Sequence, residues 1–208
     1  MAKQYQVGRG AVREALRILE TRGVLTIRPG RGGGPTVRRP RPSDLADSMS
    51  LFFQYEGARL SEVMEARNAI EPLSARLACA RMGENELDEL EATISSIRAS
   101  PDDPENFSRQ NAAFHSLIAV GSGSVILNIV AEALSTIADG EFAGVAYDRR
   151  ARLAVADAHE RILDAMRAAD SDGAAHAMRD HLVEAGAFWS RRYPEQYSQR
   201  VAWSKRWR

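Results

Sequence analysis

The feature that most constrains the fold is a stretch near the N-terminus, residues 7–37, in which a basic amphipathic helix precedes a glycine-rich segment. At about 100° per residue, Arg9, Arg13 and Arg17 fall within one quarter of the helix circumference. A separate arc carries the side chains that can pack on a core, namely Val12, Ala15, Leu16 and Leu19. The pattern therefore predicts a helix that packs through one face and presents guanidinium groups on the other.

The segment that follows has the composition of a short β-hairpin. Gly23 is placed to end the helix as a C-terminal glycine. Residues 24–27 favour a strand, residues 29–34 read Pro-Gly-Arg-Gly-Gly-Gly and favour a turn, and Thr36 and Val37 can return as a second strand. A helix followed by a basic, glycine-rich hairpin is the order of a winged helix-turn-helix.

The residues of this helix closely resemble the recognition helix of GntR-family transcription regulators. The shared pattern is Val7-x-Arg9-x-x-Val12-Arg13-Glu14-Ala15-Leu16-x-x-Leu19-Glu20-x-x-Gly23. The resemblance implies that Arg9 and Arg13 contact DNA, and Arg17 is a further candidate because it lies on the same face of the helix. It also implies that the tip of the wing, with Arg31 and Gly32, reaches into or along a groove.

Three departures from the family pattern stand out. Gly8 replaces the favoured serine N-cap, which costs only a few tenths of a kcal/mol. Pro35 removes a backbone donor, so its strand must be irregular or lie at an edge. The family's domain opens with a first helix and most of a second, whereas residues 1–6 supply only the end of that second helix. We therefore expect the DNA-binding domain, over residues 1–39, to be incomplete at its N-terminus.

The charge of the chain is strongly divided along its length. Residues 1–42 hold ten basic and two acidic side chains, a net charge of +8, and the whole chain is neutral, so the remainder carries −8. A basic head on an acidic body suits binding of double-stranded DNA through the head. No apolar run is long enough to cross a membrane, and Cys79 is the single cysteine. These features predict a cytoplasmic protein with no membrane partner.

The rest of the chain reads as helices, so the predicted fold class is mainly α, with an antiparallel bundle of six or seven helices after the partial winged helix. We expect a linker and lead-in over residues 40–59, a helical effector-binding domain over 60–190 and a basic, aromatic tail over 191–208. The expected helices cover residues 60–82, 84–98, 105–120, 124–138, part of 142–155, 156–169 and 173–189. The tail indicates nucleic-acid contact, docking on a neighbour, or a frayed end.

Polar side chains interrupt the apolar stripes of three of these helices. His115, His159 and His181 each point toward the bundle interior, and Asn111 precedes His115 by one turn. Buried polar groups must be satisfied, and a divalent transition metal satisfies three convergent imidazoles most simply. The alternative is that each ring bonds its own core neighbour. His176 shares its face with charged residues and is predicted to lie at the surface.

The spacing of these residues also resembles the FCD ligand-binding domain of the FadR-type GntR subfamily. The pattern is Asn111-x-x-x-His115, then His159-x-x-Ile162-x-x-Ala165, then Ala174 followed by Met178-x-x-His181-Leu182. The resemblance implies that Asn111, His115, His159 and His181 hold a metal, with zinc or nickel favoured, and that a small carboxylate effector completes its coordination. Asn111 replaces the commoner aspartate, and this substitution weakens the expected affinity.

Arg67 is the candidate effector-binding cation. It lies on the inward stripe of the first bundle helix, one turn before Glu71. One interpretation is a local ion pair with Glu71. The other is a guanidinium that binds the carboxylate of the effector, a role that the matching arginine often has in the domains it resembles.

Together these features predict a homodimeric, DNA-binding transcription repressor whose operator affinity is controlled by a small carboxylic-acid metabolite. One alternative is an effector-binding or dimerisation module that has lost DNA binding through the missing N-terminal helices. The other is a metal-dependent hydrolase. The sequence disfavours that enzyme because it lacks the adjacent His-Asp pair of helical phosphohydrolases and offers no inward carboxylate near the three imidazoles as a general base.

Overall fold

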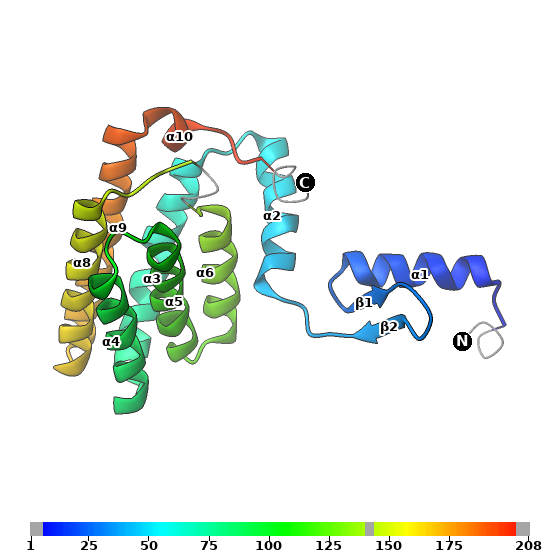
Figure 1. The fold of residues 1–208 in the computed structure, drawn as a ribbon, viewed down its shortest axis with the longest axis horizontal. Coiled ribbons are helices and arrows are strands. Elements are labelled where there is room, and N and C mark those ends of the chain that lie inside the picture. Colours follow the sequence, from blue (N-terminus) through cyan, green and yellow to red (C-terminus); the bar gives the residue numbers. More distant parts are fainter. Residues whose placement is uncertain (1–5, 140–143, 203–208) are drawn as a thin grey trace. The chain divides into compact units, whose positions relative to one another are not determined.

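The computed structural model describes residues 6–139 and 144–202. The chain divides into two compact units, Met1–Leu45 and Ala46–Arg208, and each is described by itself. The described residues are mainly helical, with one short helix and a β-hairpin in the first unit and a helical bundle in the second (Figure 1). The predicted fold class is confirmed.

The first unit begins with the basic helix and the hairpin that the sequence predicts. Helix α1 spans Arg9–Thr21. Gly23 follows its C-cap, and the φ of Gly23, 73°, is the left-handed conformation that favours glycine. The N–H groups of Gly23 and Val24 donate to the carbonyls of Glu20 and Leu19, a Schellman motif that satisfies the last turn. Strands β1, Leu25–Arg28, and β2, Gly34–Val37, then pair antiparallel.

Pro35 fits this hairpin because of its place in the register. It lies opposite Ile27, while the Arg38 N–H donates to the Val24 carbonyl three pairs further along the ladder. Ladder hydrogen bonds alternate between pairs, so the Ile27–Pro35 pair makes none and the missing N–H costs nothing. The N–H of Ile27 points away from β2 and donates to Glu20 Oε1 at 2.8 Å.

The segment predicted as linker and lead-in contains a helix. Helix α2 spans Pro42–Glu56, and Pro42 occupies its first turn, where proline is tolerated because that N–H has no partner within a helix. Asp44 lies in the same turn and binds the guanidinium of Arg38 through both oxygens, at 2.6 and 2.8 Å. Pro42 therefore marks the start of a helix, and the predicted linker is not extended throughout.

The second unit is built from antiparallel helices that run side by side (Figure 1). Four of them begin at an Asp or Ser whose side chain accepts a hydrogen bond from the first-turn backbone. After α2, the helices are α3 Leu60–Cys79, α4 Glu84–Ala99, α5 Pro104–Gly121, α6 Val125–Ile137, α8 Arg149–Arg167, α9 Ser171–Arg192 and α10 Pro194–Ser198.

The core of this unit lies between α3, α4, α5, α8 and α9. Helix α3 packs along α9, and α8 packs against both α9 and α4. Phe114, Leu90 and Ile162 are fully buried at its centre. The sequence predicts separate helices over 142–155 and 156–169, whereas the structure has one continuous helix, α8, that begins after the N-cap Asp148.

The C-terminal segment is docked on the bundle as far as residue 202. Beyond α10, the Gln199 carbonyl accepts the Leu60 N–H at 3.0 Å, and the Val201 N–H donates to the Ala58 carbonyl at 2.9 Å. Val201 is buried. The interpretation of a frayed tail is therefore wrong for residues 193–202, while Trp203 and Trp207 lie outside the described residues. No helix among those described is both long and apolar enough to cross a bilayer.

Candidate metal and effector site

Three helices bring their imidazoles together inside the second unit. His115 lies on α5, His159 on α8 and His181 on α9, and all three are buried. One potential ligand nitrogen from each ring lies within 4.8 Å of those of the other two. The three rings that the sequence places on inward faces therefore form one cluster. The alternative, in which each ring bonds only its own core neighbour, is wrong for the three rings together.

The spacing within the cluster fits a shared metal ion. His181 Nε2 and His115 Nε2 lie 3.2 Å apart. Two nitrogens at about 2.0–2.1 Å from one ion are roughly 3.3 Å apart at a tetrahedral angle and roughly 2.9 Å at a right angle. Imidazole nitrogens suit zinc, nickel and other divalent transition metals. The triad could therefore bind a metal.

His159 provides the strongest local argument for a ligand. Its ring is fully buried and stacks on Phe114 with centroids 3.8 Å apart and 5° between the planes. Neither of its nitrogens has a hydrogen-bond partner among the described residues. An unpaired buried nitrogen costs about 1–3 kcal/mol. A cation bound between the three rings would satisfy one of the two.

Two rings of the cluster, His159 and His181, are held in the neutral form that metals require. Burial lowers the pKa of His159 well below its usual value, and the neighbouring His181 and His115 lower it further. Burial, followed by repulsion from His115, lowers the pKa of His181 to about 3. At neutral pH both rings therefore offer a lone pair without first releasing a proton.

Glu71 is a functional residue whose role the sequence did not reveal. Its Oε2 accepts a hydrogen bond from His115 Nδ1 at 2.7 Å, and its Oε1 accepts one from Arg67 Nε at 2.5 Å. Burial alone would raise the pKa of Glu71, but Arg67 and His115 outweigh it and hold that pKa far below the usual range. The ionised carboxylate fixes the His115 tautomer and turns Nε2 toward the other rings, as carboxylates beside metal-binding histidines do.

An inward carboxylate does lie near the imidazoles, because Glu71 contacts His115. The periodicity of α3 did place Glu71 on an inward face, but only the packing of α3 against α5 shows which ring it meets. Both of its oxygens are occupied, by Arg67 and His115.

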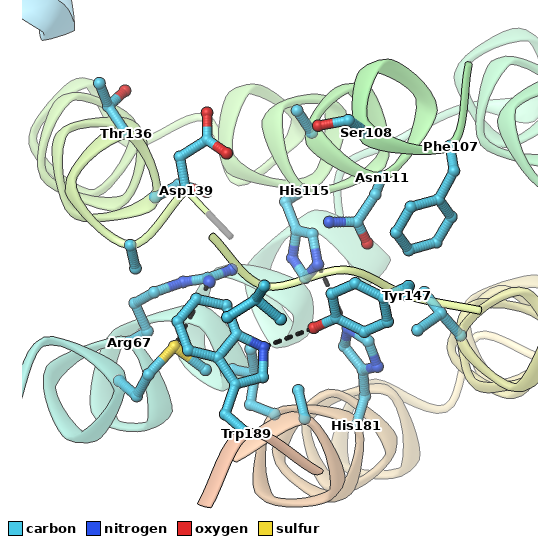
Figure 2. Close-up of a pocket in the computed structure, with 18 of the residues that line it drawn as sticks. Arg67, Phe107, Ser108, Asn111, His115, Thr136, Asp139, Tyr147, His181 and Trp189 are labelled. Carbon is cyan, nitrogen blue, oxygen red and sulfur yellow. Dashed lines mark hydrogen bonds between the residues drawn. The ribbon is translucent and has the colours of Figure 1, made fainter. Parts of the chain in front are cut away.

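Arg67 combines the two interpretations offered for it. It forms the i,i+4 ion pair with Glu71, and it is buried. It also lines a cavity of about 660 Å³ shared with His115 and His181 (Figure 2). Its Nη2 makes no hydrogen bond to any described residue, so the guanidinium retains a donor for a ligand.

Asn111 lines the same cavity from α5, one turn before His115 (Figure 2). Its amide makes no hydrogen bond to a described residue and remains available to a ligand. Trp189 and Tyr147 also line the cavity, and Trp189 Nε1 donates to Tyr147 Oη at 2.6 Å. The sequence did not single out these two residues. His176 is 75% exposed, as predicted, and lies 3.4 Å from Asp180.

The candidate DNA-binding residues all belong to the first unit. Arg9, Arg13 and Arg17 lie on α1 at i, i+4 and i+8 and are exposed. Arg31 and Gly32 lie in the exposed turn between β1 and β2. The structure thus presents all five at the surface, and their contact with DNA stays a prediction.

Comparison with known families and proteins agrees with this architecture. The FCD domain matches residues 62–184, and the bacterial regulatory proteins of the gntR family match residues 1–33. The 208 residues include only part of the GntR helix-turn-helix domain.

Several relatives are named as transcription regulators. A protein of Escherichia coli (strain K12), described as a regulatory protein of the L-lactate dehydrogenase operon, is 31% identical over 88% of this chain and 72% of its own. The HTH-type transcriptional repressor NanR of Citrobacter rodentium (strain ICC168) is 27% identical over 89% of this chain and 72% of its own.

Two solved structures show the same fold. Streptococcus agalactiae GntR has a TM-score of 0.65 at 23% identity and covers 88% of this chain and 84% of its own. E. coli McbR/YncC has a TM-score of 0.57 at 19% identity and covers 92% of this chain and 84% of its own. Because the FCD match spans more than half of the sequence and the relatives are regulators and not enzymes, the chain belongs to the GntR family of transcription regulators and carries an FCD domain.

Proposed function

We propose that the protein is a repressor whose affinity for an operator is controlled by a small carboxylate effector bound in the FCD cavity. The observation that carries this proposal is that one cavity is lined by the ion-paired guanidinium of Arg67 and by two imidazoles, His115 and His181, which cluster with the buried His159. A divalent metal, zinc or nickel, held by His115, His159, His181 and Asn111 would supply open coordination positions for a carboxylate oxygen.

Arg67 would bind the second oxygen of that carboxylate. Its Nε is fixed by Glu71, so the guanidinium plane is already oriented before a ligand arrives. A planar guanidinium with a free amino group suits a carboxylate better than a lysine would. Glu71 contacts both Arg67 and His115, so one side chain positions the guanidinium and the imidazole that face the effector.

DNA binding is assigned to the first unit. The exposed Arg9, Arg13 and Arg17 would contact bases or phosphates, while Arg31 and Gly32 would meet the backbone or a groove from the wing. The net charge of +8 over residues 1–42 supports this assignment, because phosphate neutralisation supplies much of the affinity for DNA.

We assign a homodimer, in which two recognition helices read the half-sites of a pseudo-palindrome. Exposed apolar side chains on neighbouring helices of the second unit support a self-complementary surface. Leu73 on α3 is 46% exposed, and Val125 and Ile126 on α6 are 71% and 70% exposed. Helices α3 and α6 pack against each other, so these residues belong to adjacent elements.

A second function, an effector-binding module without DNA binding, is favoured by one observation. Helix α1 has no buried residue, and its Ile18 and Leu19 are 53% and 42% exposed. A recognition helix that is not packed on a core does not hold its arginines in fixed positions for contact with DNA.

The test for the effector is titration calorimetry of the zinc-loaded protein with a panel of small carboxylic acids. We expect at least one acid to bind, and Arg67→Leu to weaken it at least tenfold. Arg179→Leu removes an exposed guanidinium on α9 and is the matched control. Equal binding by wild type and Arg67→Leu would contradict the assigned role.

The test for DNA binding is an electrophoretic shift with duplexes selected from a random-sequence pool. Arg13→Ala should weaken the shift by at least tenfold, whereas Arg150→Ala, an exposed arginine of the second unit, should not. An unchanged shift with Arg13→Ala would exclude α1 as the reader. No shift at low salt in the wild type would favour the effector module.

A further inference from the structure

The segment that enters α8 forms part of the cavity wall. Residues 144–148, which we call the strap, precede this helix and have no regular secondary structure. Four of them line the cavity, namely Gly144, Val145, Ala146 and Tyr147. The other described lining residues lie in helices α3, α5, α6, α8 and α9, except Ala138 and Asp139 just after α6. Figure 2 shows the strap crossing the cavity, with Tyr147 directed at Trp189.

The strap is attached to the rest of the helical unit by side chains and not by its own backbone ladder. Among the described residues, no backbone group of residues 144–147 bonds another backbone group. Instead, Tyr193 Oη donates to the Ala146 carbonyl at 2.6 Å, and Trp189 Nε1 donates to Tyr147 Oη at 2.6 Å. The helices around the cavity are held by backbone bonds at every turn. Movement of the strap therefore breaks side-chain contacts only, and no helix has to open.

Aromatic packing concentrates these contacts on one residue. The ring of Tyr147 stacks on Phe188 with centroids 4.9 Å apart and 21° between the planes. On its α5 side the same ring lies 5.1 Å from the ring of Phe107. Such ring pairs stabilise a contact beyond the apolar area that they bury. Tyr147 thus holds the strap through two ring contacts and the hydrogen bond from Trp189.

The two ends of the strap differ in freedom. Gly144 has a φ of 78°, and a Cβ placed there would meet nothing within 4 Å, so the chain has room to rotate at this residue. At the other end, Asp148 is the N-cap of α8 and accepts the Ala151 N–H at 2.8 Å. The strap therefore has a free pivot before it and a fixed helix start after it.

The groups behind the strap are shielded from solvent. His115, His181 and Arg67 line the cavity and are all buried. A small molecule that reaches them must pass the wall, and local opening occurs first where few backbone hydrogen bonds hold the chain. Within the described lining, the strap meets this condition.

We propose that the strap is a gate to the cavity, and that it opens when Tyr147 leaves Trp189 and Phe188. Opening admits a small molecule to the imidazoles and Arg67, and closing excludes bulk water from them. The inference goes beyond the proposed function, because entry to the cavity does not depend on which metal or effector binds there.

The test measures how fast a reagent reaches a thiol placed in the cavity wall. Ala131 lines the cavity from α6 and is buried, so Cys79→Ala combined with Ala131→Cys gives a parent protein with its single thiol at this position. The thiolate forms a mixed disulfide with methyl methanethiosulfonate and displaces methanesulfinate, and mass spectrometry follows the modified fraction. We expect Tyr147→Ala to raise the rate at least tenfold. Tyr147→Phe keeps the ring but removes the acceptor of the Trp189 N–H, and should raise the rate by a smaller factor.

Tyr197→Ala is the matched control, because Tyr197 is a half-buried tyrosine on α10 outside the cavity lining. It should leave the rate unchanged. Urea below the unfolding transition separates the gate from global unfolding, since a local opening exposes little surface and responds weakly to denaturant.

Three results would each overturn the inference: equal rates in Tyr147→Ala and the parent, an equal acceleration in Tyr197→Ala, or a urea dependence as steep as that of global unfolding. The thiol reaction needs neither metal nor effector. A failure of every carboxylic acid to bind would therefore count against the proposed function and leave the result for the gate unchanged.

Discussion

The imidazole of His159 lies parallel to the ring of Phe114, sealed from solvent, with both nitrogens unpaired. A side chain in this state lowers the stability of the metal-free protein, since a buried polar atom without a partner loses its bonds to water. The same state favours ligation, because nothing must be broken before a metal binds. At the residue scale, the structure therefore ties stability and metal binding to one ring.

We expect His159→Leu to separate these two properties. The variant removes two unpaired nitrogens, so its metal-free form should melt at a temperature no lower than that of the wild type. Zinc should raise the melting temperature of the wild type but not of the variant, because binding to the folded state is the source of the increase. Thermal melts with and without zinc measure both effects. His176→Leu, at an exposed position, should retain the zinc effect; an equal zinc shift in His159→Leu would rule out this ring as a ligand.

The lowered histidine pKa values predict acid lability of the metal-free protein. An unfolded histidine takes up a proton near pH 6.5, whereas folded His181 does so only near pH 3. The unfolded state therefore binds more protons between these values, and stability is present above about pH 6.5 and is lost as the pH falls. Urea unfolding at pH 7.5 and 5.0 should show a loss of about 2 kcal/mol for His181, and a further loss for His159, whose pKa burial also lowers. The same free energy of unfolding at both pH values would contradict the assignment of buried neutral rings.

At the scale of elements, α3 contributes a buried charged pair that reaches α5. Arg67 and Glu71 stand one turn apart, and Glu71 extends the pair to His115. Removal of one member of a buried ion pair leaves an uncompensated charge, which costs far more than the loss of an exposed pair. The pair therefore fixes how α3 and α5 meet, in addition to holding groups that face the cavity.

Glu71→Ala should lower the free energy of unfolding by about 3–5 kcal/mol, because buried Arg67 then lacks its partner. Replacement of both residues, Arg67→Met with Glu71→Leu, should recover a large part of that loss. Asp180→Ala, which breaks the exposed contact with His176, should cost less than about 1 kcal/mol. Urea unfolding of the metal-free variants gives all three values. A loss in Glu71→Ala no greater than in Asp180→Ala would show that the pair contributes little.

The same elements show what the sequence could predict. Helical periodicity places a residue on an inward face, and this sufficed for His115, His159 and His181 on three helices and for the surface position of His176. Periodicity within one helix does not say which neighbour it faces, so the contact of Glu71 with His115 was not predictable. The linker and lead-in predicted over residues 40–59 did not anticipate α2, although Pro42 is acceptable in the first turn of a helix.

At the scale of the whole molecule, the second unit exposes apolar surface on α3 and α6. Leu73, Val125 and Ile126 are each about half exposed or more. A self-complementary contact through this surface would follow a twofold axis, the commonest symmetry of homodimers. A dimer held by such a contact would carry two copies of the cationic first unit, a number that suits a palindromic operator.

Ile126→Asp should weaken self-association, because a charge placed in a covered apolar contact is left desolvated and unpaired. Sedimentation velocity at micromolar concentration should show a dimer for the wild type and a larger share of monomer for the variant. Val183→Asp, at a 54% exposed valine on α9, is the matched control and should remain dimeric. A monomeric wild type, or a variant as dimeric as the wild type, would exclude this surface as the contact.

The backbone hydrogen bonds between the last described residues and the start of α3 bear on how the helical unit can be circularly permuted. Ala58 and Leu60 are hydrogen-bonded to Val201 and Gln199, so the start of α3 and the last described residues lie beside each other. Joining them through a short peptide, and opening the chain in a connection between two helices, would give a circular permutant with every core contact intact. We expect such a permutant to fold, and it would move the attachment point of any fused domain to another side of the bundle.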